Sequence, residues 1–323
     1  MKRRSVILMA AMVGLGALSG AACAQAKYPS KPIRIIVPFP AGSGTDASAR
    51  YVAQHMSELL GQSVVVDNRA GGNGFIAAQA VAQSPADGYT IFVTTMTTQS
   101  VNPHLYKKLP YDPFKDFAPV GMITKSPMVL VVRNTAGQPR SLSELTAKAK
   151  KDVGKITYAS GNTSSRVAAE MYANQSGIKL LQIPYKGTPQ ALTDVIGGQV
   201  EIMFPDLTPA VPLVKDGKLR ALAVTGTRRV PVLPDVPTMA EAGVPVDLVA
   251  WAGALVPAGT PPQIISQLSE VMQKVLSTQQ AKDFFARFGG EPTPSSPAEM
   301  EQFLKTELES WGRAIRVAGI EKE

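Results

Sequence analysis

The stretch IRIIVPFPAGSGTDASARYVAQHMSELL, residues 33–60, decides the fold class of this chain. Residues 33–37 are rich in isoleucine and valine, which predicts a strand. From Thr45 to Leu60 apolar side chains recur at helical spacing, and Gly61 predicts the end of that helix. A strand, a glycine-rich loop and a helix in this order are typical of α/β proteins.

The alternation of strand and helix patterns continues along the chain and predicts an α/β fold with mainly parallel sheets flanked by helices. Further strands are expected over 64–66, 89–94, 128–132, 156–159, 180–183, 200–204, 219–224 and 249–256. Further helices are expected over 73–83, 143–151, 164–175, 189–196, 209–215, 261–277, 279–288 and 297–317.

The last three helical segments need a sheet to cover their apolar faces, and the first α/β series is the nearest candidate. The chain is therefore expected to leave a first lobe near Lys125 and to return to it near Ala250. This predicts a first lobe of residues 27–125 plus 250–323 and a second lobe of residues 126–249. Two crossings between the lobes would form a hinge, with a cleft beside it.

The first 26 residues have the pattern of a secretory signal peptide. Lys2, Arg3 and Arg4 precede an apolar run over 6–18, which is short for a membrane span, and small residues follow. Cleavage after about Ala26 and a periplasmic location are expected. One alternative is lipidation of Cys23, but Gly20 stands where a lipoprotein signal usually has leucine. The other is twin-arginine export, but the residues after Arg4 fit its consensus poorly.

The composition excludes several classes of site. Of the 323 residues, 45% are hydrophobic, which indicates a globular protein with a sizeable core. Two histidines and one cysteine nearly exclude thiol catalysis, disulfides and zinc sites built from cysteine and histidine. Neither a metal nor a cofactor is expected. The net charge is +8, but the basic residues are scattered, which favours small anions over nucleic acid as the partner. A monomer is expected.

The loop between the first strand and the first helix is a candidate anion site. Gly42 and Gly44 allow close backbone approach, and the start of the helix offers unpaired N–H groups and a positive dipole end. A plain glycine-rich connector with Thr45 or Asp46 as the N-cap residue is the alternative. Asp46 is expected to cap the helix or orient water rather than to bind the anion itself.

The same loop also resembles a dinucleotide-binding fingerprint. Residues 42–47 match G-x-G-x-x-A, and Asp67 follows at about the required spacing. However, residues 38–41 separate the strand from the first glycine, whereas the fingerprint turn starts directly after the strand. A nucleotide-dependent oxidoreductase therefore stays the alternative function, and a periplasmic hydrolase lacks a supporting G-x-S-x-G motif.

Further polar loops follow other predicted strands. Residues 158–165 are rich in hydroxyl side chains and precede a helix, and residues 184–189 bring Tyr185 and Lys186 to a similar position. The segments 94–98 and 204–206 follow two more strands. Ligands of open α/β sheets bind beyond the carboxyl ends of the strands, so these segments are expected to border the cleft.

At these motifs the sequence resembles the substrate-binding proteins of tripartite tricarboxylate transporters, the Bordetella uptake gene family. The resemblance covers nearly the whole chain after the predicted signal peptide. The segments that carry it are Val37-Pro38-Phe39, Thr45-Asp46, Asp67-Asn68-Arg69, Gly71-Gly72, Asp87-Gly88-Tyr89-Thr90, Leu109-Pro110-Tyr111-Asp112, Tyr158-Ala159-Ser160, Pro184-Tyr185-Lys186-Gly187, residues 217–223 and 233–238, and Pro257-Ala258-Gly259-Thr260-Pro261.

The resemblance implies a periplasmic solute-binding protein with the two-lobed Venus-flytrap fold, without catalytic activity. Such a protein captures a small carboxylate, here expected to be a dicarboxylate or an aromatic one, and delivers it to membrane transporter subunits; a sensor that contacts a membrane receptor is the alternative. The loops over 38–46 and 160–165 resemble the family's carboxylate-holding pincer, although residues 40–44 and 162–163 depart from its glycine pattern. The expected ligand-binding residues are Phe39, Gly42, Ser43, Gly44, Thr45, Asp46, Thr95, Met96, Ser160, Gly161, Asn162, Thr163, Ser164, Tyr185, Lys186, Pro205 and Asp206.

Overall fold

The strand and helix that open the folded chain are β1 (Ile33–Val37) and α2 (Gly44–Leu60), as expected from their pattern. They belong to a compact unit from Lys31 to Glu323 in a computed structural model that describes residues 28–323. The predicted signal peptide lies outside the described residues. Within residues 28–323, no helix is long and apolar enough to cross a membrane.

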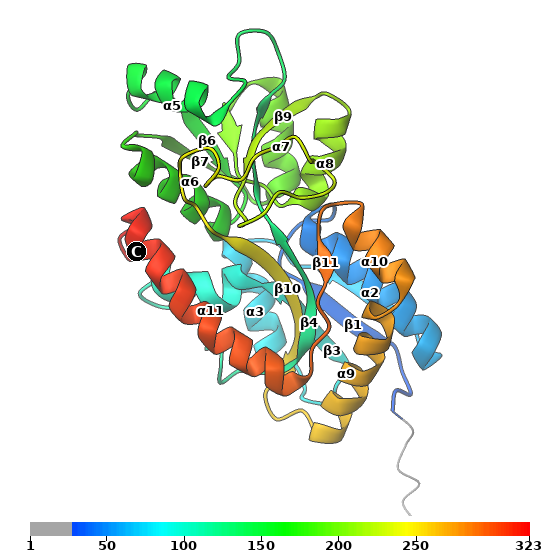
Figure 1. Ribbon diagram of the computed structural model, residues 1–323. Helices are drawn as coiled ribbons and strands as arrows, with labels where there is room; N and C mark the ends of the chain where they lie inside the picture. Colours follow the sequence, from blue (N-terminus) through cyan, green and yellow to red (C-terminus); the bar gives the residue numbers. More distant parts are fainter. Residues whose placement is uncertain (1–27) are drawn as a thin grey trace, which may run out of the picture. The chain divides into compact units, whose positions relative to one another are not determined.

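A six-stranded sheet holds β1 near one edge, in the order β11-β4-β10-β3-β1-β2 (Figure 1). Strands β1, β2 and β3 are parallel, whereas β10 runs antiparallel to β3, and β4 antiparallel to β10 and β11. The other strands of this sheet are β2 (Val64–Asn68), β3 (Thr90–Thr95), β4 (Phe117–Pro127), β10 (Val249–Pro257) and β11 (Glu291–Pro292).

A five-stranded sheet is built from the middle of the chain, in the order β7-β6-β8-β5-β9. β6 is parallel to β7 and β8, whereas β5 is antiparallel to β8 and β9. Its strands are β5 (Val129–Arg133), β6 (Thr157–Ser160), β7 (Leu181–Pro184), β8 (Ile202–Met203) and β9 (Leu219–Val224).

Both sheets are therefore mixed, which corrects the expectation of mainly parallel sheets. In the first sheet, the reason lies in the two strands that adjoin the second sheet. β4 runs toward the second sheet and ends at Pro127, and β10 returns from it, with Val249 paired to Pro127. Because one strand leaves and the other comes back side by side, they must be antiparallel.

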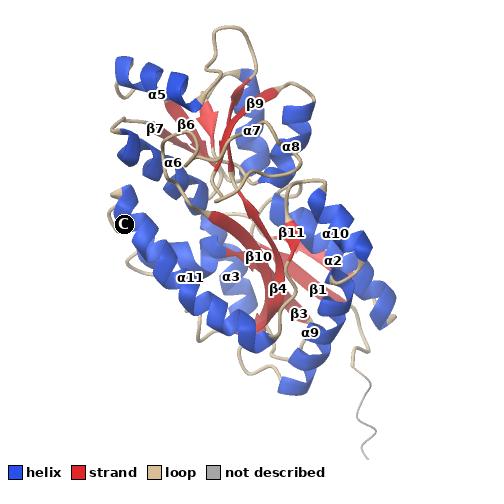
Figure 2. Cartoon of the chain, viewed as in Figure 1, coloured by secondary structure: helices blue, strands red, loops and turns tan. Residues whose placement is uncertain are grey.

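Helices cover both sheets (Figure 2). Helices α2 and α9 pack along the six-stranded sheet, and α11 packs against β4 and also against α6 of the middle segment. The other helices are α3 (Phe75–Ala82), α4 (Asn102–Leu105), α5 (Leu142–Lys151), α6 (Thr163–Ser176), α7 (Thr188–Gly197), α8 (Leu207–Lys215), α9 (Pro262–Leu276), α10 (Gln279–Ala286) and α11 (Pro297–Ala318).

Four elements have no counterpart in the sequence pattern: β4, β11, the short helix α4 and the π-helical turn η2 (Thr97–Val101). β4 contains proline, glycine and polar residues, so it lacks the alternation of a half-buried strand. It becomes a strand because its neighbours β10 and β11 supply hydrogen-bond partners on both edges. β11 is two residues long, which is too short for any periodicity.

Candidate functional site

A small cavity lies where helix starts from both halves of the fold converge on strands of the first sheet. Its volume is about 40 Å³, which is enough for a group of carboxylate size. We name it the inner cavity. Its lining consists of Phe39, Gly44, Thr45, Ser48, Thr95, Met96, Thr124, Ser126, Asn162, Asp206, Thr208, Ala250, Trp251, Ala252, Phe285 and Gly290.

The starts of α2, α6 and α8 all reach this cavity. Gly44 is the first residue of α2, Asn162 is the N-cap residue of α6, and Asp206 is the N-cap residue of α8. The first main-chain hydrogen bond of α2 runs from the Ala47 N–H to the Ser43 carbonyl. The N–H groups of the residues before Ala47 therefore have no acceptor within the helix backbone. Helix starts carry a positive partial charge, so the free N–H groups at these starts are suited to binding a negatively charged group.

Asp46 organises the loop that leads into α2. Its carboxylate accepts hydrogen bonds from the Gly42 N–H at 2.9 Å, the Arg50 side chain at 3.0 Å and the Asn68 amide at 2.9 Å. Partial burial would raise the pKa of Asp46, but these three donors outweigh it and hold the pKa below its ordinary value. Asp46 thus stays ionised and closes the loop, and it does not line the inner cavity.

A second cavity, of about 310 Å³, lies beside the first and shares Phe39 and Asn162 with it. We name it the outer cavity. Gly187 belongs to the loop behind it, and a Cβ atom there would lie 2.5 Å from Cδ of Pro40. Only glycine allows this approach, which brings the loop after β7 against the loop after β1. The outer cavity is lined by Pro38, Phe39, residues 71–74, residues 160–163, Arg166, Gln182, Pro184, Tyr185 and Lys186.

Several polar side chains of the outer region are already engaged within the protein. The Ser160 hydroxyl accepts a hydrogen bond from Gln182 at 2.8 Å. The Tyr185 hydroxyl donates to Asp194 at 2.7 Å; burial and that carboxylate raise the pKa of Tyr185 to about 12. Tyr185 is consequently a neutral, oriented wall of this cavity.

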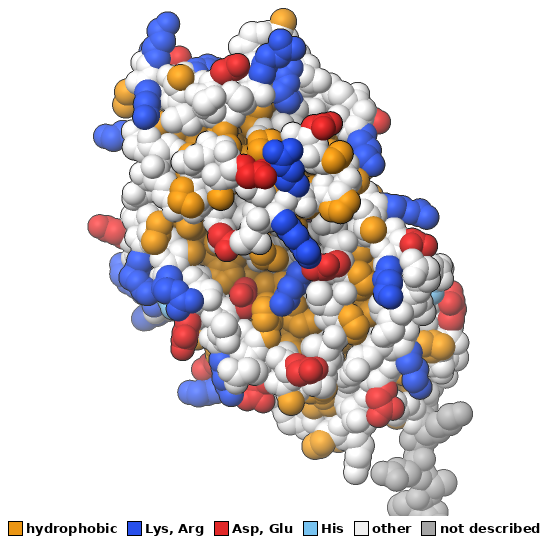
Figure 3. Space-filling view, viewed as in Figure 1, with side chains coloured by type: hydrophobic (Ala, Val, Ile, Leu, Met, Phe, Trp, Pro, Cys, Tyr) orange, Lys and Arg blue, Asp and Glu red, His pale blue; other side chains and the backbone are white. Residues whose placement is uncertain are grey.

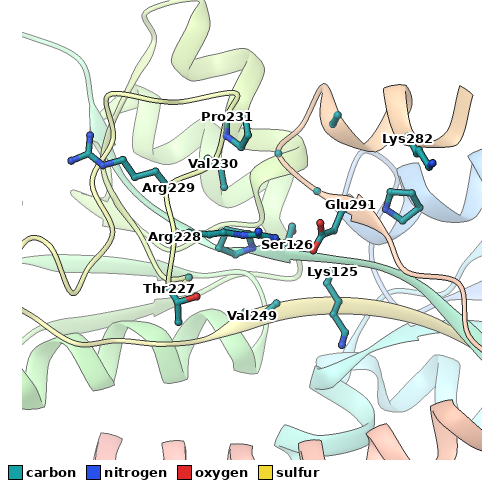
Figure 4. A pocket seen from close by; sticks show the side chains of 16 residues that line it. Lys125, Ser126, Thr227, Arg228, Arg229, Val230, Pro231, Val249, Lys282 and Glu291 are labelled. Atoms are coloured by element: carbon teal, nitrogen blue, oxygen red, sulfur yellow. Dashed lines mark hydrogen bonds and ion pairs between the residues drawn. The ribbon is translucent and has the colours of Figure 1, made fainter. Parts of the chain in front are cut away.

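A third cavity, of about 740 Å³, joins the inner cavity at Ser126 and Gly290. We name it the mouth cavity (Figure 4). Arg228 crosses it and lies 3.5 Å from Glu291, whereas Arg229 points away toward Glu241. Between these charges the walls are mostly apolar, from Pro127, Val230, Pro231, Val249, Ala286 and Pro292. This volume lies within the range of small-molecule pockets in proteins.

The inner and outer cavities bring together twelve of the seventeen residues that the sequence singled out. The five that line neither cavity are Gly42, Ser43, Asp46, Ser164 and Pro205. Ser43 caps α2 by accepting from the Asp46 N–H, and Ser164 is fully buried against Thr97. The Pro205 carbonyl accepts from the Val129 N–H, and the Gly42 N–H donates to Asp46.

Sequence reasoning missed the residues that β4 and β10 contribute. Thr124, Ser126 and Trp251 line the inner cavity from within these strands, where no loop motif marks them. Trp251 is held in place by its indole N–H, which donates to Glu307 at 2.8 Å. In the sequence, Thr124 and Ser126 are marked only as small polar residues within a strand, and this pattern is too common to identify a binding site.

The charges on the surface are dispersed. On the face shown in Figure 3, basic and acidic side chains are interspersed around an apolar area in the middle of the view. This distribution agrees with the scattered basic residues of the sequence.

Comparison with known proteins identifies the family. Residues 48–320 match the family model described as tripartite tricarboxylate transporter family receptor. BugT of Bordetella pertussis is 35% identical over 296 residues, which cover 90% of each chain. Among solved structures, Rpa4515 of R. palustris with adipate is 33% identical with a TM-score of 0.89, and covers 92% of this chain and 100% of its own.

Two further solved structures are similar over most of the chain. The periplasmic binding protein BugD has a TM-score of 0.87 at 34% identity, and covers 92% of this chain and 100% of its own. MatC of Rhodopseudomonas palustris with bound malate has a TM-score of 0.85 at 30% identity, and covers 89% of this chain and 100% of its own. The two-sheet α/β fold is therefore that of the periplasmic binding proteins, and the chain belongs to the receptor family of the tripartite tricarboxylate transporters.

Proposed function

We propose that this protein captures a small carboxylate in the periplasm and delivers it to the membrane subunits of a tripartite tricarboxylate-type transporter. The observation that carries the proposal is the convergence of the starts of α2, α6 and α8 on the inner cavity, whose lining contains neither lysine nor arginine. Solved relatives hold adipate and malate, which are carboxylates.

The carboxylate is held by backbone and hydroxyl groups rather than by an ion pair. An anion near a helix N-terminus gains about 0.3–1 kcal/mol at an exposed site and up to about 2 kcal/mol when partly buried. Hydrogen bonds to a charged group contribute about 1.5–3 kcal/mol each. The candidate donors at the start of α2 are the N–H groups of Gly44 and Thr45 and the Thr45 hydroxyl, since both residues line this cavity, whereas the Ser48 hydroxyl donates to the Gly44 carbonyl at 3.0 Å.

The rest of the ligand lies in the space that adjoins the inner cavity. Phe39, Met96 and Trp251 form apolar walls, and the mouth cavity continues past Ser126 and Gly290. This space suits an aliphatic or aromatic middle, which extends the ligand class to aromatic carboxylates.

Residues 27–125 with 250–323 and residues 126–249 act as two lobes that close on the ligand, with β4 and β10 as the two crossings of the hinge. Contacts from both lobes to one ligand favour the closed form over the open form. A membrane partner can then distinguish the ligand-bound protein by its closed form. The protein works as a monomer without a cofactor, and binding rather than catalysis is its role. Export with cleavage after about Ala26 brings it to the periplasm.

A thermal-shift screen of carboxylates tests the proposal, with NAD and ATP as controls. A ligand that binds only the folded protein stabilises it by about 2.7 kcal/mol at 100 times its Kd. At least one carboxylate is expected to raise Tm, while the nucleotides leave it unchanged. A screen in which only nucleotides raise Tm contradicts the proposal and favours an oxidoreductase.

A further inference from the structure

Asp206 is the single charged side chain in the lining of the inner cavity. It stands at the N-cap position of α8, yet its side chain makes no capping hydrogen bond to that helix. Within residues 28–323, the structure gives its carboxyl group no hydrogen bond and no ion pair. The carboxyl group of Asp206 thus serves neither its own helix nor a neighbouring cation.

The Asp206 carboxyl group lies at the start of α2, the element proposed to hold the ligand carboxylate. A Cβ atom built on Gly44 would be 3.4 Å from Oδ2 of Asp206. Gly44 is the first residue of α2, so Asp206 and the N–H groups of α2 border the same small volume. The start of α2 carries a positive partial charge and the Asp206 carboxyl group a negative one. Both therefore lie close enough to contact two adjacent groups of the same ligand.

The charge of Asp206 makes this arrangement selective. The residue is half-buried, and the loss of water contacts raises the pKa of its carboxyl group to about 6, so that the group is still mainly ionised at neutral pH. No lysine, arginine or histidine lines the inner cavity to compensate it. A second ligand carboxylate beside Asp206 would add a further like charge to this small volume, whereas a hydroxyl or ammonium group would supply the hydrogen bond that the Asp206 carboxylate lacks.

We propose that Asp206 selects carboxylates that carry a hydrogen-bond donor, a hydroxyl or an ammonium group, next to the carboxylate held by α2. This inference rests on the proposed function and narrows its ligand class. The ligand carboxylate occupies the N–H groups at Gly44 and Thr45, and the donor on the adjacent carbon points at Asp206. Ligands without that donor leave the Asp206 carboxylate unpaired and bind more weakly.

Calorimetry with compounds matched in carbon skeleton tests this selection. The sets are succinate, malate and aspartate; adipate and 2-aminoadipate; and 3-phenylpropanoate, phenyllactate and phenylalanine. In at least one set, the donor-bearing member is expected to bind the unmodified protein about tenfold or more tighter than the plain acid at pH 7.5. Asp206→Asn is expected to remove most of that preference.

Asp216→Asn is the matched control. Asp216 caps the other end of α8, is exposed and lies 3.8 Å from Lys218, so the variant makes the same charge change on the same helix away from the cavity. It is expected to leave the preference intact. Circular dichroism of both variants verifies that they fold.

The outcomes separate this inference from the proposed function. The selection by Asp206 is wrong if plain acids bind as tightly as the matched acids that carry a donor. It is also wrong if plain acids bind more tightly and their affinity rises as the pH falls toward 6. In both cases the protein is still a carboxylate receptor. Loss of the preference in Asp216→Asn as well also overturns it, because the effect is then one of net charge. If no compound of the sets binds or raises Tm, the proposed function itself fails and this inference falls with it.

Discussion

The Thr97 hydroxyl oxygen lies 2.6 Å from that of Ser164, and both residues are fully buried. This hydrogen bond joins the π-helical turn after β3 to the first turn of α6, and so connects segments that follow strands of different sheets. A second bond, in which the Thr163 hydroxyl donates to the Asn102 side chain at 2.9 Å, lies in the same contact. Two hydroxyls of the predicted pincer loop therefore serve the contact between the two halves of the fold.

Replacing Ser164 by alanine is expected to destabilise the protein. The substitution leaves the buried Thr97 hydroxyl without this partner, which costs about 1–3 kcal/mol of the free energy of unfolding. Urea denaturation measures it. Ser176→Ala, at the other end of α6, is the matched control, since the buried Ser176 hydroxyl has no partner and its removal is expected to change stability little. Equal destabilisation by the two substitutions would contradict the assigned role of the Thr97–Ser164 contact.

Ligand binding is expected to change the fluorescence of Trp251. The chain has two tryptophans, and the indole N–H groups of both donate to Glu307, at 2.8 Å from Trp251 and 3.0 Å from Trp311. Trp251 lines the inner cavity and Trp311 does not. The change on addition of a bound carboxylate is therefore expected to persist in Trp311→Phe and to disappear in Trp251→Phe. Titration of both variants with a carboxylate that raises Tm checks this, and the reverse pattern would place the ligand elsewhere.

The ligand-free stability of Asp206→Asn is expected to depend on pH. The folded-state pKa of about 6 lies above the ordinary value of 3.8, so the ionised carboxyl destabilises the folded protein above pH 6, and this penalty fades as the pH falls toward 3.8. Asparagine removes the penalty. The variant is expected to gain about 1–3 kcal/mol at pH 7.5 and about nothing at pH 3.5, provided both proteins are folded there. Urea denaturation at the two pH values, with Asp216→Asn alongside, measures it; a gain that is equal at both values would refute the pKa argument.

Substitutions in the three loops separate backbone binding from an ion pair. Gly44→Val places branched carbons against Asp206, only 3.4 Å from the position of a Cβ atom, and closes the start of α2. It is expected to weaken carboxylate binding by far more than tenfold. Ser160→Ala removes a hydroxyl that lines the outer cavity and is expected to weaken binding about tenfold. Both effects are measured by calorimetry.

Lys186→Met is the contrasting variant. Lys186 lines the outer cavity but is exposed, unlike the buried Ser160, and an exposed ion pair contributes little. Its loss is therefore expected to change the affinity less than threefold. If this variant abolishes binding while Gly44→Val and Ser160→Ala bind normally, a side-chain ion pair holds the ligand and the helix-start mechanism is wrong.

Local sequence patterns are sufficient to predict several helices, strands and loops of this protein. The strand at 33–37, the helix from 44 to 60 and the terminal helix that begins near Pro297 follow from periodicity and capping residues, which act within a few turns of chain. The polar loops after the strands also follow from the sequence, because parallel strands end at a common edge of the sheet. For this reason most of the expected ligand-binding residues lie around the inner and outer cavities.

Other features depend on contacts between residues far apart in the chain and could not be predicted from local patterns. The direction of β4 and β10, and hence the mixed sheets, comes from hydrogen bonds between segments far apart in the chain. The same pairing brings Trp251 and Ser126 into the inner cavity, although no local motif marks them. Asp206 also lies close to Gly44, and Thr97 hydrogen-bonds to Ser164, only because elements far apart in the chain pack together. These contacts form only when the whole fold forms.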